Sequence, residues 1–291
     1  MSKFVALLAS GLAEGAIVAL AAVGFLLIYK ATGVINFAQG DLITLGAYVA
    51  IWATQDLGFE LVPGYLFTLL VMFAVGIALE RLAYAPLRGR SVHVVVIATL
   101  GAALVLRAFI GLWQGTTPKF LESPVEGEVV ELFGANIAYQ RIVIIVVTAL
   151  VVLLTIAVFQ WTQFGRELRA TAADRETARL YGVPVTRLSM IAFGLSAALA
   201  GLAGILIAPL GSVDLTLGFN VMIAGFAAAI FGGFGSIGGV AIGGFAFGMV
   251  EQVFGGYVLR DYKATFPFVF MILVIALRPR GVFTRGAGQR L

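Results

Sequence analysis

The sequence predicts an all-α membrane protein that crosses the bilayer about eight to ten times. Its 291 residues are 61% hydrophobic and only 12% charged, whereas soluble domains carry roughly 25% charged residues. The mean hydropathy is +1.04. Since a soluble surface must stay polar, an apolar excess of this size indicates a polytopic chain surrounded by lipid.

Nine stretches are long and apolar enough to be membrane-spanning helices, because a bilayer core of about 30 Å needs about 20 apolar residues. They cover residues 4–29, 38–55, 62–85, 92–112, 140–161, 188–209, 219–233, 237–256 and 264–278. The first stretch continues past Glu14 to Ile28, which favours a retained helix over a signal peptide. The two stretches beside Gly235 are short and glycine-interrupted, and residues 33–45 include a candidate re-entrant piece, so some spans are expected to be discontinuous.

Charged residues between these stretches predict the orientation of the chain. Arginines concentrate in residues 81–90, 166–187 and 278–290, whereas acids concentrate in residues 56–60 and 113–140. With nine spans, the basic segments all fall on one side of the membrane and the acidic segments on the other. Cytoplasmic loops carry the excess of Lys and Arg, so we expect the N-terminus outside and the C-terminus in the cytoplasm.

Glycines recur at every seventh position in the second half of the chain. The series is Gly204, Gly211, Gly218, Gly225, Gly232 and Gly239. Within a helix this spacing places small residues on one face, where a second helix can approach closely. We therefore expect tight helix packing in this region.

The residues that catalysis or metal binding usually requires are scarce. Cysteine is absent and His93 is the only histidine, so no metal site is expected. No G-x-x-x-x-G-K-[ST] segment is present, which predicts that the chain is not an enzyme and has no ATPase site of its own. Residues 233–238 match G-x-G-x-x-G but lie between apolar stretches with no suitable acid following. We interpret Gly233, Gly235 and Gly238 as a helix break.

A few polar residues interrupt the apolar stretches and are candidates for a solute pathway. They are Asn36, Gln39, Asp41, Glu14, Glu251 and Gln252. Charged groups at membrane depth are costly, so these side chains are expected to face protein or water. For Asn36 and Asp41, capping of a helix N-terminus is the alternative interpretation. Arg107 either extends toward the outer surface or pairs with an acid.

The segment around residues 164–187 is charged and helix-forming in a chain that is otherwise apolar. Its composition predicts one cytoplasmic helix from Arg166 to Tyr181, ended by Gly182 and Pro184. Such a helix binds a soluble partner or lies on lipid headgroups. The candidate partner-contacting residues are Arg166, Glu167, Arg169, Asp174, Arg175, Glu176, Arg179 and Gly182.

Three stretches of sequence resemble the permease subunits of branched-chain amino acid importers of the ATP-binding-cassette class. They are Gly33–Asp41 with Leu45–Tyr48, Arg166–Asp174 with Ala178–Gly182, and Phe231–Gly239. The resemblance extends over nearly the whole chain, and the order and spacing of the three stretches are specific to this family. It implies a single transmembrane permease domain over residues 1–291, with residues 164–187 as the segment that couples to an ATPase.

The resemblance also implies the partners and the setting of the chain. The expected partners are a second related permease, two cytoplasmic ATP-binding subunits and an external substrate-binding protein, all at a bacterial inner membrane. The chain itself is expected to bind no cofactor, with ATP and Mg used by the partner subunits. Similar permeases transport urea, short amides or other small polar solutes, so these remain alternative substrates. A self-sufficient channel or secondary transporter with a discontinuous helix is the alternative mechanism.

Overall fold

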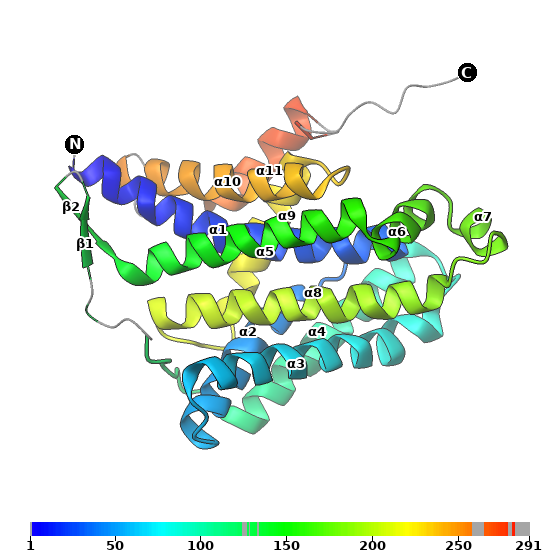
Figure 1. Cartoon of the computed structure of the whole chain (residues 1–291), viewed down its shortest axis with the longest axis horizontal. Helices are drawn as coiled ribbons and strands as arrows, with labels where there is room; N and C mark the ends of the chain where they lie inside the picture. Colours follow the sequence, from blue (N-terminus) through cyan, green and yellow to red (C-terminus); the bar gives the residue numbers. More distant parts are fainter. Residues whose placement is uncertain are drawn as a thin grey trace.

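The computed structural model describes residues 2–123, 127, 129–132, 134–257, 265–278 and 281–282, and these residues form an all-α bundle (Figure 1). The first half contains α1 (Ser2–Thr32), α2 (Gln39–Ile51), α3 (Leu61–Leu79), α4 (Val92–Gln114), β1 (Val129–Leu132) and β2 (Ala135–Ala138). Helix α2 continues into the π-helical turn η1 (Trp52–Asp56), and α3 continues into η2 (Glu80–Tyr84) and η3 (Ala85–Leu87). The second half contains α5 (Tyr139–Trp161), α6 (Gln163–Ala173), α7 (Arg175–Leu180), α8 (Val185–Ile207), η4 (Ala208–Leu210), α9 (Leu217–Gly232), α10 (Ile237–Tyr257) and α11 (Phe266–Leu277).

Each of the nine apolar stretches identified in the sequence corresponds to a helix in the described residues, with ends that differ by a few residues. Within the described ranges, six helical segments are long and apolar enough to cross a membrane. They are Ser2–Thr32, Leu61–Leu87, Val92–Gln114, Tyr139–Trp161, Val185–Leu210 and Ile237–Tyr257. The remaining three apolar helices, α2, α9 and α11, are shorter. The prediction of a polytopic all-α membrane protein is therefore confirmed.

The two ends of the bundle carry different structures. The long helices lie side by side, with α6 and α7 at one end and the β1–β2 hairpin at the other (Figure 1). Gln55, directly before the first acidic segment, donates from Nε2 to the carbonyl of Phe120 in the second at 2.8 Å, so the two acidic segments lie close together. Arg88 and Arg187 line one cavity at the α7 end, so two basic segments meet there. In the third basic segment, residues 278–290, positions 279–280 and 283–290 lie outside the described residues.

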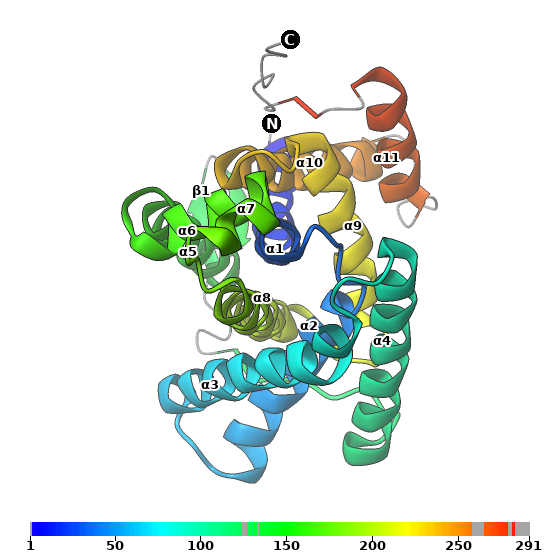
Figure 2. The same cartoon turned by 90° about the vertical axis from the view of Figure 1, so that its right-hand side faces the viewer.

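Helix α1 runs through the centre of the bundle, as Figure 2 shows when the molecule is viewed from the α7 end. It contacts α5, α8, α9 and α10. Its apolar residues are distributed around the whole helix rather than along one stripe, which is typical of a helix buried on all sides. Gly11 and Gly15 of α1 lie directly against the backbone of α10, which allows these two helices to pack closely.

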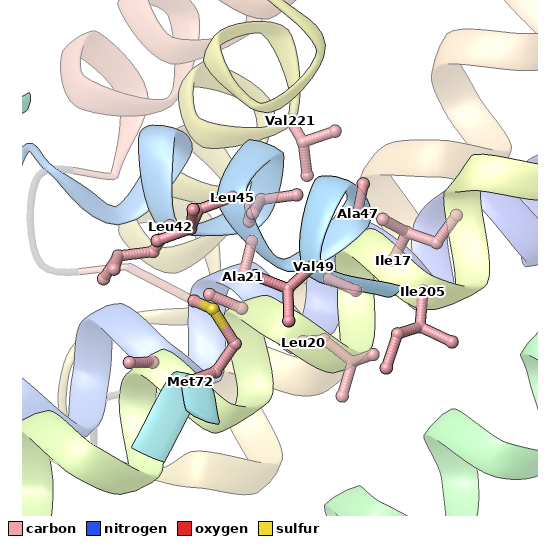
Figure 3. Packing of buried hydrophobic residues seen from close by; sticks show 14 of the residues in the cluster. Ile17, Leu20, Ala21, Leu42, Leu45, Ala47, Val49, Met72, Ile205 and Val221 are labelled. Carbon is pink, nitrogen blue, oxygen red and sulfur yellow. The ribbon is translucent and has the colours of Figure 1, made fainter. Parts of the chain in front are cut away.

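The packing around α2 shows how the bundle core is filled (Figure 3). Leu42 and Val49 of α2 belong to the same buried cluster as Met72 of α3 and Val221 of α9. Small residues allow this close approach, because a Cβ added at Gly218 of α9 would overlap the carbonyl oxygen of α2 residue Gly40. Four glycines of the seven-residue series have such close neighbours, and Gly211 faces open space. They are Gly204, Gly218, Gly225 and Gly232. The prediction of tight packing is confirmed at these four positions.

Helix α2 begins inside the bundle rather than at its end. Residues 33–38 are not helical and lead from the end of α1 back into the bundle, where Gln39 contacts Ser196 of α8. Ser196 is the twelfth residue of α8, so the contact lies roughly 16 Å from the start of that helix at 1.5 Å per residue. The non-helical piece, residues 33–38, lies within residues 33–45, where a re-entrant piece was expected. Of the two stretches beside Gly235, α9 is short, but α10 has 21 residues and is long enough to span.

Candidate functional site

The start of α2 carries a buried cluster of polar side chains that includes three of the predicted pathway residues, Asn36, Gln39 and Asp41. Asn36 and Gln39 are 1% and 0% exposed. The Ser196 hydroxyl lies 3.0 Å from Gln39 Oε1 and 2.9 Å from the carbonyl of Gly24, so it links α2, α8 and α1. Asn36 Oδ1 accepts the amide of Ala38 at 3.1 Å and caps the turn before α2. Asn36 Nδ2 is buried without a partner in the part of the chain described.

Asp41 belongs to the first turn of α2 and pairs with Arg107 of α4. Arg107 Nε lies 2.8 Å from Asp41 Oδ1, and Nη2 lies 3.4 Å from Oδ2. The Asp41 side chain is 4% exposed and the Arg107 side chain 33%. The Arg107 guanidinium also lies 5.8 Å from the centre of the Phe219 ring on α9. Of the two sequence-based interpretations of Arg107, pairing with an acid is the one that the structure supports.

Glu14 and Glu251 line a second region, a cavity of about 580 Å³ that also contacts Ser212 and Asn220. Glu14 comes from α1 and Glu251 from α10, two helices that pack against each other along much of their length. Carboxylates at membrane depth are stable when they face protein or water instead of lipid. The cavity therefore combines two carboxylates, an amide and a hydroxyl with a wall that is mostly apolar.

The six predicted pathway residues therefore do not form one cluster. Asn36, Gln39 and Asp41 lie around the start of α2, whereas Glu14 and Glu251 share the cavity beside α9. Gln252 lies against Gly11 of α1 instead. Hydropathy identified these residues one at a time, and only the packing of α1, α2, α8 and α10 separates them into groups.

The segment predicted as one helix from Arg166 to Tyr181 is two helices, α6 and α7, which meet at Asp174. Asp174 has an extended backbone, and its carboxylate accepts the amides of Glu176 at 3.0 Å and Thr177 at 3.1 Å. An aspartate at this position competes with the helix and caps the next one. Gly182 adopts φ +82° after α7, as the predicted stop requires.

Most candidate partner-contacting residues of this segment make contacts within the chain or line a cavity. The exposed apolar residues beside them, Leu180 and Tyr181, were not among those candidates. Arg169 donates to the carbonyl of Phe159 at the end of α5, and Arg175 Nη1 lies 2.7 Å from the hydroxyl of Tyr84. Glu167 accepts from Gln163 at 2.7 Å, and Arg166 donates to Trp161 at 3.3 Å. Glu176 and Arg179 line a cavity of about 1010 Å³ beside the start of α8. Leu180 and Tyr181 at the end of α7 are 87% and 85% exposed.

The glycine-rich break between α9 and α10 is a short turn of residues 233–236. Gly233 adopts φ +79°, and Lys30 Nζ from the end of α1 donates to the carbonyl of Gly235 at 3.0 Å. The turn therefore lies at the same end of the bundle as α6, because Lys30 and Arg169 line one small cavity with Gly235. Gly238 is already within the first turn of α10.

Sequence reasoning did not identify several residues that support this site. Ser196 lies in an apolar stretch and is 157 positions away from its partner Gln39. Tyr84 is 91 positions away from Arg175. A serine or tyrosine in an apolar helix is uncharged and does not stand out in the sequence. Its hydrogen-bond partner can be identified only from the packing of the helices. Glu80, which pairs with Arg88 beneath the larger cavity, did have a charge signal.

Comparison with known families places the whole bundle among transport proteins. Residues 7–275 match the family model described as the permease component of the branched-chain amino acid transport system. The high-affinity branched-chain amino acid transport system permease protein BraD of Pseudomonas aeruginosa is 34% identical over 292 residues, covering 96% of this chain and 95% of the relative.

Two further relatives show the same similarity. The high-affinity branched-chain amino acid transport system permease protein LivH of Escherichia coli (strain K12) is 32% identical over 289 residues, covering 95% of this chain and 94% of the relative. A probable branched-chain amino acid transport permease protein of Methanocaldococcus jannaschii is 31% identical over 293 residues, covering 92% and 90%. The polar cluster at the start of α2, the cavity lined by Glu14 and Glu251, and the α6–α7 segment all lie within the matched residues.

Proposed function

The chain belongs to the branched-chain amino acid transport permease family, and on this premise we propose that it forms half of the translocation pore of an ATP-driven importer for branched-chain or related small amino acids. It is a transport component of a membrane system, and the second half of the pore is a related permease in a heterodimer. Two cytoplasmic ATP-binding subunits hydrolyse ATP with Mg, and this chain binds no cofactor itself. An external substrate-binding protein delivers the solute.

The observation that carries the proposal is the position and surface of α6 and α7. These helices project beyond the long helices at one end of the bundle (Figure 1). Leu180 and Tyr181 are almost fully exposed there, outside the segments that could span a membrane. Exposed apolar side chains rimmed by charged ones are typical of a protein contact. We assign this end to the cytoplasm and this surface to an ATPase subunit, which places the N-terminus outside.

The contacts of α6 and α7 provide a mechanical link from that surface to the membrane helices. Arg175 of α7 holds Tyr84 of η2, the continuation of α3, and Tyr84 packs on Phe193 of α8 with ring centres 5.5 Å apart. Arg169 of α6 holds the end of α5. A displacement of this segment therefore moves α3, α5 and α8 together. ATP can shift the pore between inward-open and outward-open states only if the ATP-bound ATPase subunits bind one of these states more tightly than the other.

Two regions are proposed for the solute pathway. The cavity lined by Glu14 and Glu251 lies toward the hairpin end, since it includes Gly211, which also lines a cavity with the hairpin residue Ala138. We assign it to the outer part of the pathway. The polar cluster of Asn36, Gln39 and Asp41 lies further inside, where residues 33–38 interrupt the helical path. Irregular backbone at membrane depth is stable only where it is buried in protein or lines a cavity.

The test of the proposed coupling surface uses Leu180→Ala and Tyr181→Ala in the assembled importer. The measurements are co-purification of the ATPase subunits and ATPase activity stimulated by the loaded binding protein. Truncating two central anchor residues of an interface is expected to weaken association at least about tenfold. Leu112→Ala is the matched control, because Leu112 is 90% exposed on α4 and lies near the opposite end of the bundle.

The expected result is loss of stimulated ATPase activity in the two α7 variants and full activity in the control. Unchanged co-purification and stimulation in both α7 variants would contradict the assignment. Uptake by the purified chain alone, without ATP or partner subunits, would instead support the self-sufficient transporter.

A further inference from the structure

The largest cavity described in the bundle, about 1010 Å³, has a strongly basic wall. It lies at the α7 end, between the η2–α4 connection, the α1–α2 connection and the start of α8. Six arginines line it together with one acid, Glu176. They are Arg81, Arg88, Arg90, Arg175, Arg179 and Arg187.

Two of these arginines are held in place by buried partners. Arg88 pairs with Glu80, a side chain with no exposed surface, and Arg88 Nη2 also lies 3.3 Å from Ser189 Oγ. Arg175 is held by Tyr84, and its guanidinium lies 6.0 Å from the centre of that ring. Arginines that only set the orientation of a membrane protein need no fixed side-chain position, because orientation depends on which side of the membrane carries the charge. The wall is therefore a built surface of defined shape.

The other four arginines supply unpaired charge to the same space. Among the described residues, the ion pairs are Arg88–Glu80 and Arg107–Asp41, so neither of them involves these four arginines. The four are solvent-exposed residues, and like charges gathered around one cavity attract an anion into it. Their planar donor pairs match phosphate oxygens in a bidentate geometry.

We infer that this cavity binds a phosphate-bearing anion. Basic pockets between membrane helices on the cytoplasmic side suit the headgroups of anionic lipids. Exposed apolar side chains near the lining residues suit acyl chains, since Leu82 of η2 follows Arg81 and Ile97 of α4 lies two residues after Val95, and they are 80% and 68% exposed. A soluble phosphate or phosphorylated metabolite offers the same chemistry from the cytoplasm. Because α7 and α8 both line the cavity, a bound anion would join the protruding segment to the η2–α4 connection.

The test is binding of defined probes to the purified full-length chain in detergent. Native mass spectrometry compares retention of dioleoylphosphatidylglycerol with that of zwitterionic dioleoylphosphatidylcholine. A parallel thermal-stability titration compares inorganic phosphate with chloride at equal ionic strength. The variant Arg90→Gln/Arg187→Gln removes two unpaired charges, and Arg90→Lys/Arg187→Lys retains them. Lys119→Gln/Arg141→Gln removes two charges at the hairpin end and serves as the matched control.

The inference predicts that the glutamine double variant binds at least one phosphate probe about tenfold more weakly than the wild type. The lysine variant keeps the charge but loses the bidentate geometry, so its binding is expected to lie between that of the wild type and that of the glutamine variant. The hairpin-end control is expected to bind like the wild type. Loss confined to phosphatidylglycerol identifies a lipid headgroup, and loss confined to inorganic phosphate identifies a soluble anion. Far-UV circular dichroism verifies that each variant is folded.

Two results would overturn the inference. One is equal binding of both phosphate probes by the wild type and the glutamine variant. The other is that neither phosphate probe binds the wild type. If the glutamine variant also no longer co-purifies with the ATPase subunits, the basic wall is a contact for an acidic protein surface.

Discussion

The ion pair between Asp41 and Arg107 predicts a measurable coupling between α2 and α4. The perturbation is Asp41→Asn, which keeps the shape of the side chain and removes its charge. In the structure both Asp41 oxygens face the guanidinium, at 2.8 and 3.4 Å. The carboxylate is almost fully buried, and two thirds of the Arg107 side chain is covered. The substitution therefore leaves a cation without its partner inside the bundle.

The size of the effect follows from this burial. Two charges about 4 Å apart attract by roughly 4 kcal/mol at an effective dielectric constant of about 20. Removing one partner of a fully buried pair costs about 3–5 kcal/mol. Because a third of Arg107 remains exposed, we expect Asp41→Asn to lower the free energy of unfolding by about 2–3 kcal/mol. The double variant Asp41→Asn/Arg107→Gln leaves no unpaired charge and should regain most of that loss.

The assay is unfolding of the purified chain in mixed detergent with increasing sodium dodecyl sulfate. Trp113 of α4 lies 5.5 Å from Trp52 of η1, so tryptophan fluorescence reports the separation of the two helices. Far-UV circular dichroism follows the whole bundle in parallel. A double-mutant cycle of the wild type, the two single variants and the double variant gives the coupling energy, which is expected to be about 2 kcal/mol. A value below about 0.5 kcal/mol would refute the argument that this pair links α2 to α4.

Three further predictions concern packing, capping and the pair beneath the basic cavity. Gly218→Ala should lower the free energy of unfolding by about 1–3 kcal/mol, because the new Cβ overlaps the carbonyl of Gly40. Gly101→Ala in α4 should be neutral or stabilising, because a Cβ at that position has no neighbour within 4 Å. Equal detergent-unfolding curves for the two variants would contradict the packing argument for Gly218. Hydrogen bonds from Thr177 hold the pKa of Asp174 below its ordinary value of 3.8. The cap that Asp174 forms therefore stabilises α7 fully above the ordinary pKa, and this stabilisation is lost as the pH falls through the lowered pKa. Asp174→Ala should therefore speed amide exchange in α7 at neutral pH, and exchange equal to the wild type would argue against the cap. Glu80→Gln should cost about 2–3 kcal/mol, since Arg88 keeps its charge and is only partly exposed; an unfolding midpoint like that of the wild type would show that the pair contributes nothing.

Much of the architecture follows from local sequence. Hydropathy located each of the nine apolar helices among the described residues, because side chains that face lipid or the packed bundle interior must be apolar. The stop after α7 was also predictable, since Gly182 needs only its own left-handed backbone. The break at Asp174 was missed although its signal is local. An aspartate within a run of helix-forming residues can face outward or cap, and composition alone favours the continuous helix.

The candidate site shows where local signals end. The sequence marked Asn36, Gln39, Asp41, Glu14 and Glu251 as polar groups in apolar surroundings, and all five are associated with the buried cluster or the cavity that the structure describes. It did not show which of them lie together. Their assignment to a solute pathway remains a prediction.

By itself, the sequence determined that this chain is a helical membrane protein of the permease family with one charged segment between apolar helices, since hydropathy and motif spacing are properties of neighbouring residues. Tertiary structure alone decided that Asp41 pairs with Arg107, that Gln39 meets Ser196, and that arginines from separate loops line one cavity. These partners are 66 and 157 positions apart for the first two pairs. Contacts over such distances depend on how the helices pack, and the packing depends on small residues such as Gly218 that carry no chemical signal of their own.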